Sequence, residues 1–263
     1  MLSDLVIPTQ ILRVLSTIRQ YDVRALLMGG QACVLYGAAE YSRDLDLAVM
    51  ATPEAMPALH AALGALNATV IAVPPFDVRY LERGHAVHFS IPDGSVSPLR
   101  VDIMSRLRGV DAFPALWERR TTIALPAGTE DAEVLVDVMA LEDLVAAKKT
   151  QRDKDWPMLR RLVDASYAAA RDDVVTAAQV EFWLAELRSP AFLLEVIARY
   201  PEAAARSSRE AVQAAVRAAL NSDVVDAALA EEQATIMAED RAYWAPLRRE
   251  LEALRHEART TRE

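Results

Sequence analysis

Residues 23–47 of the 263-residue chain read VRALLMGGQACVLYGAAEYSRDLDL and contain its most informative pattern. The apolar start reads as a short buried strand, which Gly29 and Gly30 bring to an end. The residues after the glycines suit a short helix, and LDLAVM at 45–50 reads as a second buried strand. The pattern therefore predicts a strand, a glycine pair, a short helix and another strand in succession.

Acidic residues open the second of these strands. Asp44 and Asp46 are two residues apart, so on a strand both carboxylates project from one face. Two adjacent carboxylates repel each other unless a cation lies between them, and Mg²⁺ held together with nucleotide phosphates fits that role. Gly29 and Gly30 have no Cβ, which lets backbone amides approach a phosphate closely. The alternative is a solvated strand end, because GG and DxD are each common.

A third carboxylate is expected on a neighbouring strand. Asp102 lies within LRVDIM at 99–104, and AVHFSI at 86–91 precedes it, so the two segments are predicted to pair around an intervening turn. An acid among apolar neighbours needs a partner or a chemical role. The alternative is that Asp102 points to solvent from an edge strand.

The rest of the chain changes character near residue 140. Before it, further strands are predicted at 69–73, 121–125 and 134–138, and helices at 9–20 and from Pro53 onward. After it, Ala is abundant and helices are predicted at 140–152, 155–170, 176–187, 190–199, 207–220 and 222–258, the last of them broken. The fold class is α/β (α+β), a small mixed sheet domain over residues 1–168 followed by an all-α domain over 169–263.

Composition excludes several classes of protein. The net charge of −9 and the pI of about 5.1 argue against non-specific DNA binding, which needs clustered cations. Two basic groups, at 100–120 and 148–161, are either solvated faces or a local binding site. A single cysteine, Cys33, excludes an intramolecular disulfide and a zinc finger. No apolar run is long enough for a membrane span and the start lacks the basic region of a signal peptide, so we expect a cytoplasmic protein without membrane contact.

Two blocks of residues carry a family resemblance. The first block consists of Gly29, Gly30, Ser42, Asp44, Asp46 and Asp102. The second block is LEDLVAAK at 141–148 followed by RDKD at 152–155. In this order the blocks resemble the nucleotidyltransferase superfamily, which has the polymerase-β-like fold, and in particular its AbiEii-like bacterial toxin branch. The resemblance covers roughly residues 20–165. One departure is Glu40, where many relatives have an arginine; here Arg43 stands next to Asp44 instead.

The resemblance implies an enzyme that moves a nucleotide from an NTP to a hydroxyl acceptor with Mg²⁺ or Mn²⁺. The acceptor would be RNA, such as a tRNA end, or a protein, and the enzyme would be a toxin of a toxin–antitoxin or phage-defence system, with an antitoxin as partner. The implied metal ligands are Asp44, Asp46 and Asp102. The implied nucleotide-binding residues are Gly29, Gly30, Ser42, Arg43, Lys148 and Arg152, and Lys148 would also be catalytic by neutralising the triphosphate. The alternative is a catalytically idle nucleotidyltransferase fold that acts as a binding module or antitoxin partner.

Overall fold

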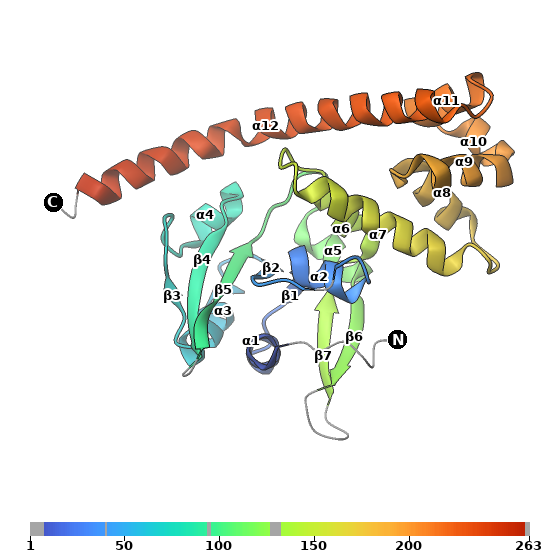
Figure 1. Ribbon diagram of the computed structural model, residues 1–263. Coiled ribbons are helices and arrows are strands. Elements are labelled where there is room, and N and C mark those ends of the chain that lie inside the picture. Colours follow the sequence, from blue (N-terminus) through green and yellow to red (C-terminus); the bar gives the residue numbers. More distant parts are fainter. Residues whose placement is uncertain (1–7, 40, 94–95, 127–132, 261–263) are drawn as a thin grey trace. The chain divides into compact units, whose positions relative to one another are not determined.

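The computed structural model describes residues 8–39, 41–93, 96–126 and 133–260, and Figure 1 labels its helices and strands. The chain divides into two compact units. The first unit consists of Met1–Leu35, Ala39–Ala147 and Trp244–Glu263, and the second of Tyr36–Ala38 and Lys148–Tyr243. None of the described helices is both long and apolar enough to cross a membrane.

A mixed sheet forms the centre of the first unit (Figure 1). Its seven described strands are β1 (Ala25–Met28), β2 (Leu45–Val49), β3 (Thr69–Val70), β4 (Val87–Asp93), β5 (Val96–Met104), β6 (Thr121–Pro126) and β7 (Glu133–Val138). They lie in the order β3-β4-β5-β2-β1-β7-β6. The pairs β2/β5 and β1/β7 are parallel, and the other neighbours are antiparallel. The expected fold class, a mixed sheet domain followed by helices, is confirmed.

The central strands supply much of the core of this unit. All four residues of β1 are buried, as are four of the five residues of β2, with Asp46 the exception. Strands covered on both faces are expected to read as continuous apolar runs, which is how both segments read in the sequence. The helices of the unit are α1 (Thr9–Gln20), α2 (Gly29–Leu35), α3 (Met56–Ala65), α4 (Val78–Arg83), α5 (Phe113–Arg119) and α6 (Leu141–Ala147).

The second unit is helical and has its own core. Its helices are α7 (Asp155–Ala170), α8 (Ala177–Glu186), α9 (Pro190–Arg199), α10 (Pro201–Arg206), α11 (Glu210–Arg217) and the first part of α12 (Ser222–Thr260). Trp183 and Tyr167 are almost fully buried, and their rings meet edge to face with centroids 5.0 Å apart. The domain boundary predicted between residues 168 and 169 falls inside α7.

Three helical predictions differ from the structure. The helix predicted over 140–152 ends at Ala147, and the one predicted over 207–220 begins at Glu210. The last helix, predicted to be broken, is continuous over 222–260 and includes Pro246. Proline removes one backbone hydrogen bond from a helix, and here the long helix persists on both sides of that missing bond. The short helices α4, α5 and α10 were not predicted.

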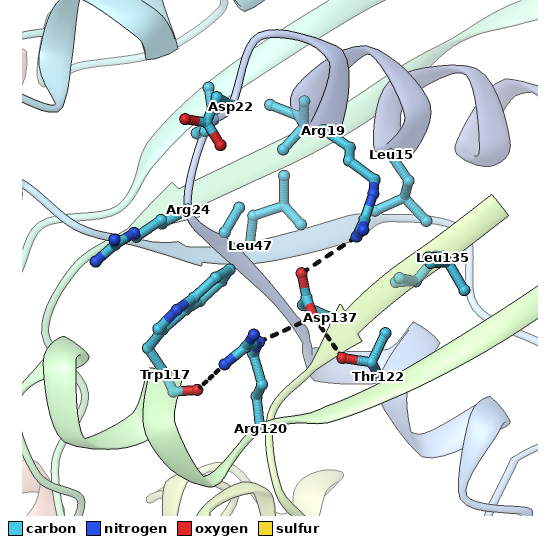
Figure 2. Close-up of a pocket in the computed structure, with 14 residues that line it drawn as sticks. Leu15, Arg19, Asp22, Arg24, Leu47, Trp117, Arg120, Thr122, Leu135 and Asp137 are labelled. Carbon is cyan, nitrogen blue, oxygen red and sulfur yellow. Dashed lines mark hydrogen bonds and ion pairs between the residues drawn. The ribbon is translucent and has the colours of Figure 1, made fainter.

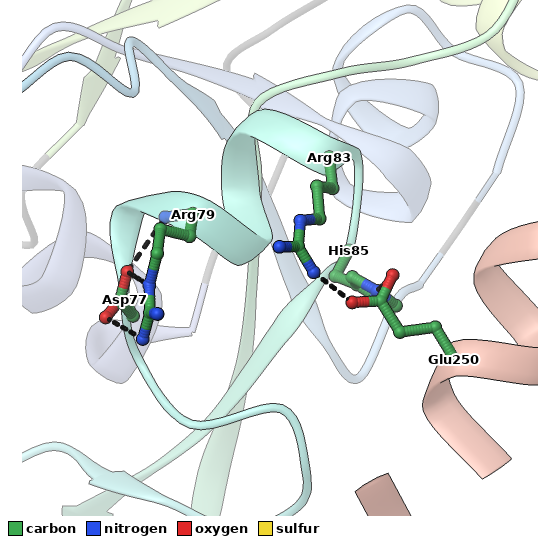
Figure 3. A network of polar contacts seen from close by, with 5 residues as sticks. All are labelled: Asp77, Arg79, Arg83, His85 and Glu250. Atoms are coloured by element: carbon green, nitrogen blue, oxygen red, sulfur yellow. Dashed lines mark hydrogen bonds and ion pairs between the residues drawn. The ribbon is translucent and has the colours of Figure 1, made fainter. Parts of the chain in front are cut away.

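A polar network ties the end of α12 to α4 within the first unit (Figure 3). The Glu250 carboxylate accepts a hydrogen bond from the buried His85 Nε2 at 3.1 Å and forms an ion pair with Arg83. Gly84 lies between these partners with φ +103°, and a Cβ there would come within 3.2 Å of the Trp244 ring. The glycine therefore allows close approach of the part of α12 that belongs to the first unit, and the network holds that part.

The Glu250 contacts predict a pH-dependent anchoring of the helix. The hydrogen bond from His85 lowers the pKa of Glu250, burial opposes this, and Arg83 lowers it further. A carboxylate whose pKa is lowered in the folded state contributes stability above its ordinary pKa of about 4.3, and this contribution is lost as the pH falls through the lower folded value. Glu250→Gln should flatten the stability profile in that range.

Hydrogen exchange measures this anchoring directly. At neutral pH, Glu250→Gln should make the amides of residues 244–260 exchange faster than in the unsubstituted protein. Glu252→Gln is the matched control, because Glu252 is exposed on the same helix. Equal exchange in the two variants would show that the network does not hold α12.

Candidate functional site

The predicted metal ligands come together on two adjacent strands of the first unit. Asp46 in β2 and Asp102 in β5 are paired residues of the parallel β2/β5 ladder. Paired residues on neighbouring strands, which lie about 4.8 Å apart, point to the same face of the sheet. Asp44 is exposed and lies in the bend just before β2, rather than on the strand as expected. Asp46 and Asp102 are therefore neighbours on the sheet, and Asp44 directly precedes β2.

The glycine pair is required by the packing of this cluster. Gly29 has φ +66°, and a Cβ at this position would lie 1.9 Å from Asp46 Oδ2. A Cβ on Gly30 would lie 2.3 Å from Ser42 Oγ. The sequence suggested that these glycines leave room for a phosphate; in the structure, the space beside them holds the side chains of Asp46 and Ser42.

A buried glutamine holds the loop that leads to the acidic residues. Gln31, in α2, is only 4% exposed and donates a hydrogen bond from Nε2 to the Ser42 carbonyl at 2.7 Å. Ser42 Oγ in turn donates to the Asp44 carbonyl at 3.3 Å. Arg43 is exposed. Gln31 was not predicted as a site residue, although an amide side chain in an otherwise apolar helix was a signal that it has a polar partner.

Asp102 is buried and has two cationic or polar neighbours. His88 Nδ1 donates to Asp102 Oδ1 at 2.8 Å, and Arg100 donates to both carboxylate oxygens, from Nε at 2.9 Å and from Nη2 at 3.0 Å. Burial works to raise the pKa of Asp102, but the hydrogen bonds from His88 and Arg100 outweigh it and hold the pKa below its ordinary value. Asp102 is thus an ionised group inside the sheet, and the alternative of a solvent-facing edge position is wrong.

Arg100 connects Asp102 to the other two carboxylates. Its hydrogen bond with Asp102 raises the pKa of the guanidinium, burial opposes this, and the negative charges of Asp102, Asp44 and Asp46 raise it further. The guanidinium therefore lies in the field of all three aspartates. Arg100 and His88 were not predicted as site residues. Arg100 stands two residues before Asp102 on a strand, which was a signal for a shared face, whereas His88 required the β4/β5 register.

The donor set fits a hard divalent cation in its chemistry. Carboxylate oxygens are the ligands that Mg²⁺ prefers in proteins, and the three aspartates share one positive neighbour, Arg100. Within the described ranges, no group of three or more His, Cys, Asp and Glu side chains is arranged to hold a metal ion. At Asp102, Arg100 donates a hydrogen bond to each carboxylate oxygen. A metal bound by Asp102 would meet the positive charge of Arg100 there.

Lys148 and Arg152 belong to the second unit, in the connection between α6 and α7, rather than on a helix as predicted. Both contact Asp155, the first residue of α7: Lys148 Nζ lies 3.7 Å from Oδ1, and Arg152 Nε donates to Oδ2 at 2.7 Å. Thr150 Oγ1 donates to the same oxygen at 2.5 Å. The contacts that the structure shows for these two predicted nucleotide-binding residues therefore stabilise the start of α7.

Asp143, in the LEDLVAAK segment of the second block, also has a structural partner. Asp143, buried in α6, accepts two hydrogen bonds from Arg119, at 3.1 and 2.9 Å. Arg119 also bonds Asp111 at 2.9 Å, and these hydrogen bonds raise the pKa of its guanidinium. Glu40, the departure from the family pattern, lies outside the described residues.

Comparisons with known proteins leave the family open. No protein-family model matches the chain, and the search of curated proteins finds no significant match. Among solved structures, the chain is similar to the crystal structure of an antigenic nucleotidyltransferase-like protein from Paracoccidioides brasiliensis. The two are 13% identical, the match covers 74% of this chain and 90% of that chain, and the TM-score is 0.41. A similarity of this size does not establish a shared fold.

Proposed function

We propose that the protein is a metal-dependent nucleotidyltransferase, with its reaction centre at Asp44, Asp46 and Asp102. The observation that carries the proposal is the pairing of Asp46 with Asp102 across β2 and β5, with Asp44 just before β2. Asp46 and Asp102 share one face of the sheet and Asp44 lies just before β2, and carboxylates that lie close together repel one another, which favours the binding of a cation beside them. The resemblance to the nucleotidyltransferase superfamily rests on these same residues.

The chain's own residues have distinct tasks in this proposal. Asp44 and Asp46 would bind the cation that accompanies the triphosphate, and Asp102, once Arg100 moves away from it, would help to position the acceptor hydroxyl. A divalent cation, when bound, would stabilise the charge on the attacking and leaving oxygens. Gly29 keeps the Asp46 carboxylate in place, and Gln31 holds the loop that carries Ser42 and Asp44. Positioning and electrostatics of this kind supply most of the catalysis in phosphoryl chemistry.

The proposed acceptor follows from the resemblance to the AbiEii-like branch of the superfamily. We infer RNA, such as a tRNA end, or a protein, with the toxin role and antitoxin partner that the AbiEii-like resemblance implies. The basic groups have many acidic partners inside the protein: Arg119 bonds Asp143, Arg120 bonds Asp137, and Lys149 bonds Glu186. This pairing reduces the positive charge available to a polyanion, and it favours a local contact over a broad RNA-binding surface.

One observation favours a second candidate function, an idle nucleotidyltransferase fold that acts as a binding module. Arg100 donates to both oxygens of Asp102, so a cation there meets a competing positive charge. If Arg100 never leaves Asp102, its positive charge keeps a cation away from that carboxylate. The protein would then bind a nucleotide or a partner without transferring anything.

Labelled nucleotides separate these functions. The full chain is incubated with each NTP labelled at the α-phosphate, with Mg²⁺ or Mn²⁺, and with total RNA and protein. Transfer of label to RNA or to protein identifies the acceptor class, and loss of transfer with EDTA shows the metal requirement. Metal-dependent NTP binding without transfer would support the idle module, and the absence of both would contradict the proposal.

A substitution of Arg100 tests whether this arginine competes with a metal ion for the Asp102 carboxylate. Arg100→Gln removes the cation that competes for Asp102, so the affinity for Mn²⁺ should rise several-fold because the guanidinium no longer neutralises the carboxylates. Electron paramagnetic resonance of free and bound Mn²⁺ measures it. Arg79→Gln is the control, since Arg79 is exposed and pairs with Asp77. A weaker affinity in Arg100→Gln alone would show that Arg100 orders the site instead of competing for it.

A further inference from the structure

A hollow lies on the first unit, and all residues that line it belong to that unit (Figure 2). Its volume is about 440 Å³, and it is lined by residues of α1, α5 and the β6/β7 hairpin. Strands β1 and β7 are neighbours in the sheet and are paired at Leu27 and Val138. Residues at the start of β1 also line the hollow. Leu47 also lines it. Because Leu47 follows Asp46 on the same strand, it points to the opposite face from the aspartate cluster.

Three arginines line this hollow: Arg19 in α1, Arg24 just before β1 and Arg120 just before β6. A half-buried Asp137 lies among them and accepts hydrogen bonds from Arg120 Nε at 3.0 Å and Thr122 Oγ1 at 2.7 Å. Arg19 Nη1 lies 3.6 Å from the other oxygen of Asp137, which is an ion pair beyond hydrogen-bond distance.

The hollow has more hydrogen-bond donors than acceptors. Each guanidinium carries five N–H donors. Arg120 uses two of its nitrogens, on Asp137 and on the Trp117 carbonyl at 2.7 Å. Among the described residues, Arg24 forms neither an ion pair nor a hydrogen bond. The lining has three arginines against two aspartates, Asp22 and Asp137, which leaves one net positive charge on a protein of net charge −9.

The ring of Trp117 helps to hold two of these guanidiniums. Arg120 lies 4.1 Å and Arg24 lies 5.8 Å from the ring centroid, within the range of a cation–π interaction. Figure 2 shows the indole between the two arginines. An interaction with a ring face positions a guanidinium without using its N–H groups, so these groups stay available to a ligand.

We propose that this hollow binds the phosphate group of a small phosphorylated ligand. The planar fork of a guanidinium matches two oxygens of a phosphate, and Arg24 and Arg19 have donors to offer. A volume of about 440 Å³ is far larger than a phosphate ion needs and falls in the range of small-molecule pockets, which leaves room for the rest of an ester. The site lies apart from the aspartate cluster and does not depend on the proposed transfer reaction.

Calorimetric titration of the full chain at constant ionic strength tests the proposal. Inorganic phosphate and adenosine monophosphate are the two probes, without divalent metal. We expect binding of at least one of them, weakened five-fold or more in both Arg19→Gln and Arg24→Gln, with Arg79→Gln unchanged. Binding of phosphate alone identifies a free-ion site, and tighter binding of the monophosphate identifies an ester site. Arg120 is left in place because it holds Asp137.

The aspartate cluster provides the second control. Asp46→Asn should bind the probes as the unsubstituted protein does, because Asp46 faces the other side of the sheet. Binding that is strengthened in Asp46→Asn but unchanged in Arg24→Gln would place the phosphate beside the aspartates and overturn the proposal. The proposal is also overturned if neither probe binds at 10 mM, or if Arg79→Gln weakens binding as much as Arg24→Gln.

Discussion

Asp46→Asn should reduce nucleotidyl transfer by at least about 100-fold, the size of effect seen when one preorganised electrostatic group is removed from a reaction centre. Asparagine keeps the shape of the side chain beside Gly29 but removes its negative charge. Since Asp46 is paired with Asp102 across β2 and β5, the change also lowers the repulsion within the cluster. The melting temperature should therefore stay the same or rise, and the metal affinity should fall.

The measurements are label transfer from an NTP, Mn²⁺ affinity and thermal unfolding, all on the same preparations. Asp111→Asn is the matched control, because Asp111 is an exposed carboxylate paired with Arg119 and lies outside the aspartate cluster. Full transfer by Asp46→Asn would refute the reaction centre. Thermal unfolding shows whether the Asp46→Asn variant is folded. If the folded variant binds Mn²⁺ as tightly as the unsubstituted protein does, Asp46 is not a metal ligand.

The sheet of the first unit could be predicted because its strands have strong local signals. The buried runs at 25–28 and 45–49 read as continuous apolar segments, and the helix over 9–20 shows one apolar face. The helices α4 and α5 have six and seven residues, too few for a clear periodicity. The return of residues 244–263 to the first unit depends on contacts with distant parts of the chain, and local patterns do not contain them.

The sequence predicted the carboxylates of the candidate site but not the residues that neutralise them. Carboxylates in a DxD pattern and an acid within an apolar strand are visible in the sequence, and the structure brings Asp46 and Asp102 into register. The neutralising partners of Asp102 were not visible. His88 lies 14 residues away and becomes its neighbour only through the β4/β5 pairing. A motif thus identifies the charged groups, whereas strand register decides which of them meet.

Gly29→Ala should lower the stability more than an alanine at any other of the described glycines. The residue has φ +66°, a conformation that costs an alanine about 1–2 kcal/mol. In addition, the new Cβ would lie 1.9 Å from Asp46 Oδ2 and 2.7 Å from Asp46 Cβ, so Asp46 or the start of α2 must move. We expect a fall in the free energy of unfolding larger than the backbone cost, and loss of metal binding and transfer.

Two other glycines separate the causes of this loss. Gly37 has φ +74°, and a Cβ added there would have no atom within 4 Å, so Gly37→Ala should cost only the backbone strain of about 1–2 kcal/mol. Gly64 is exposed within α3 and has open space, so Gly64→Ala should stabilise the protein by about 0.5–1 kcal/mol. Chemical denaturation gives all three values. If Gly29→Ala and Gly37→Ala lower the stability equally and both retain metal binding, the contact between Gly29 and Asp46 does not shape the site. A larger loss at Gly29, with metal binding lost only there, means that the glycine is needed because the Asp46 carboxylate occupies the space of its missing side chain.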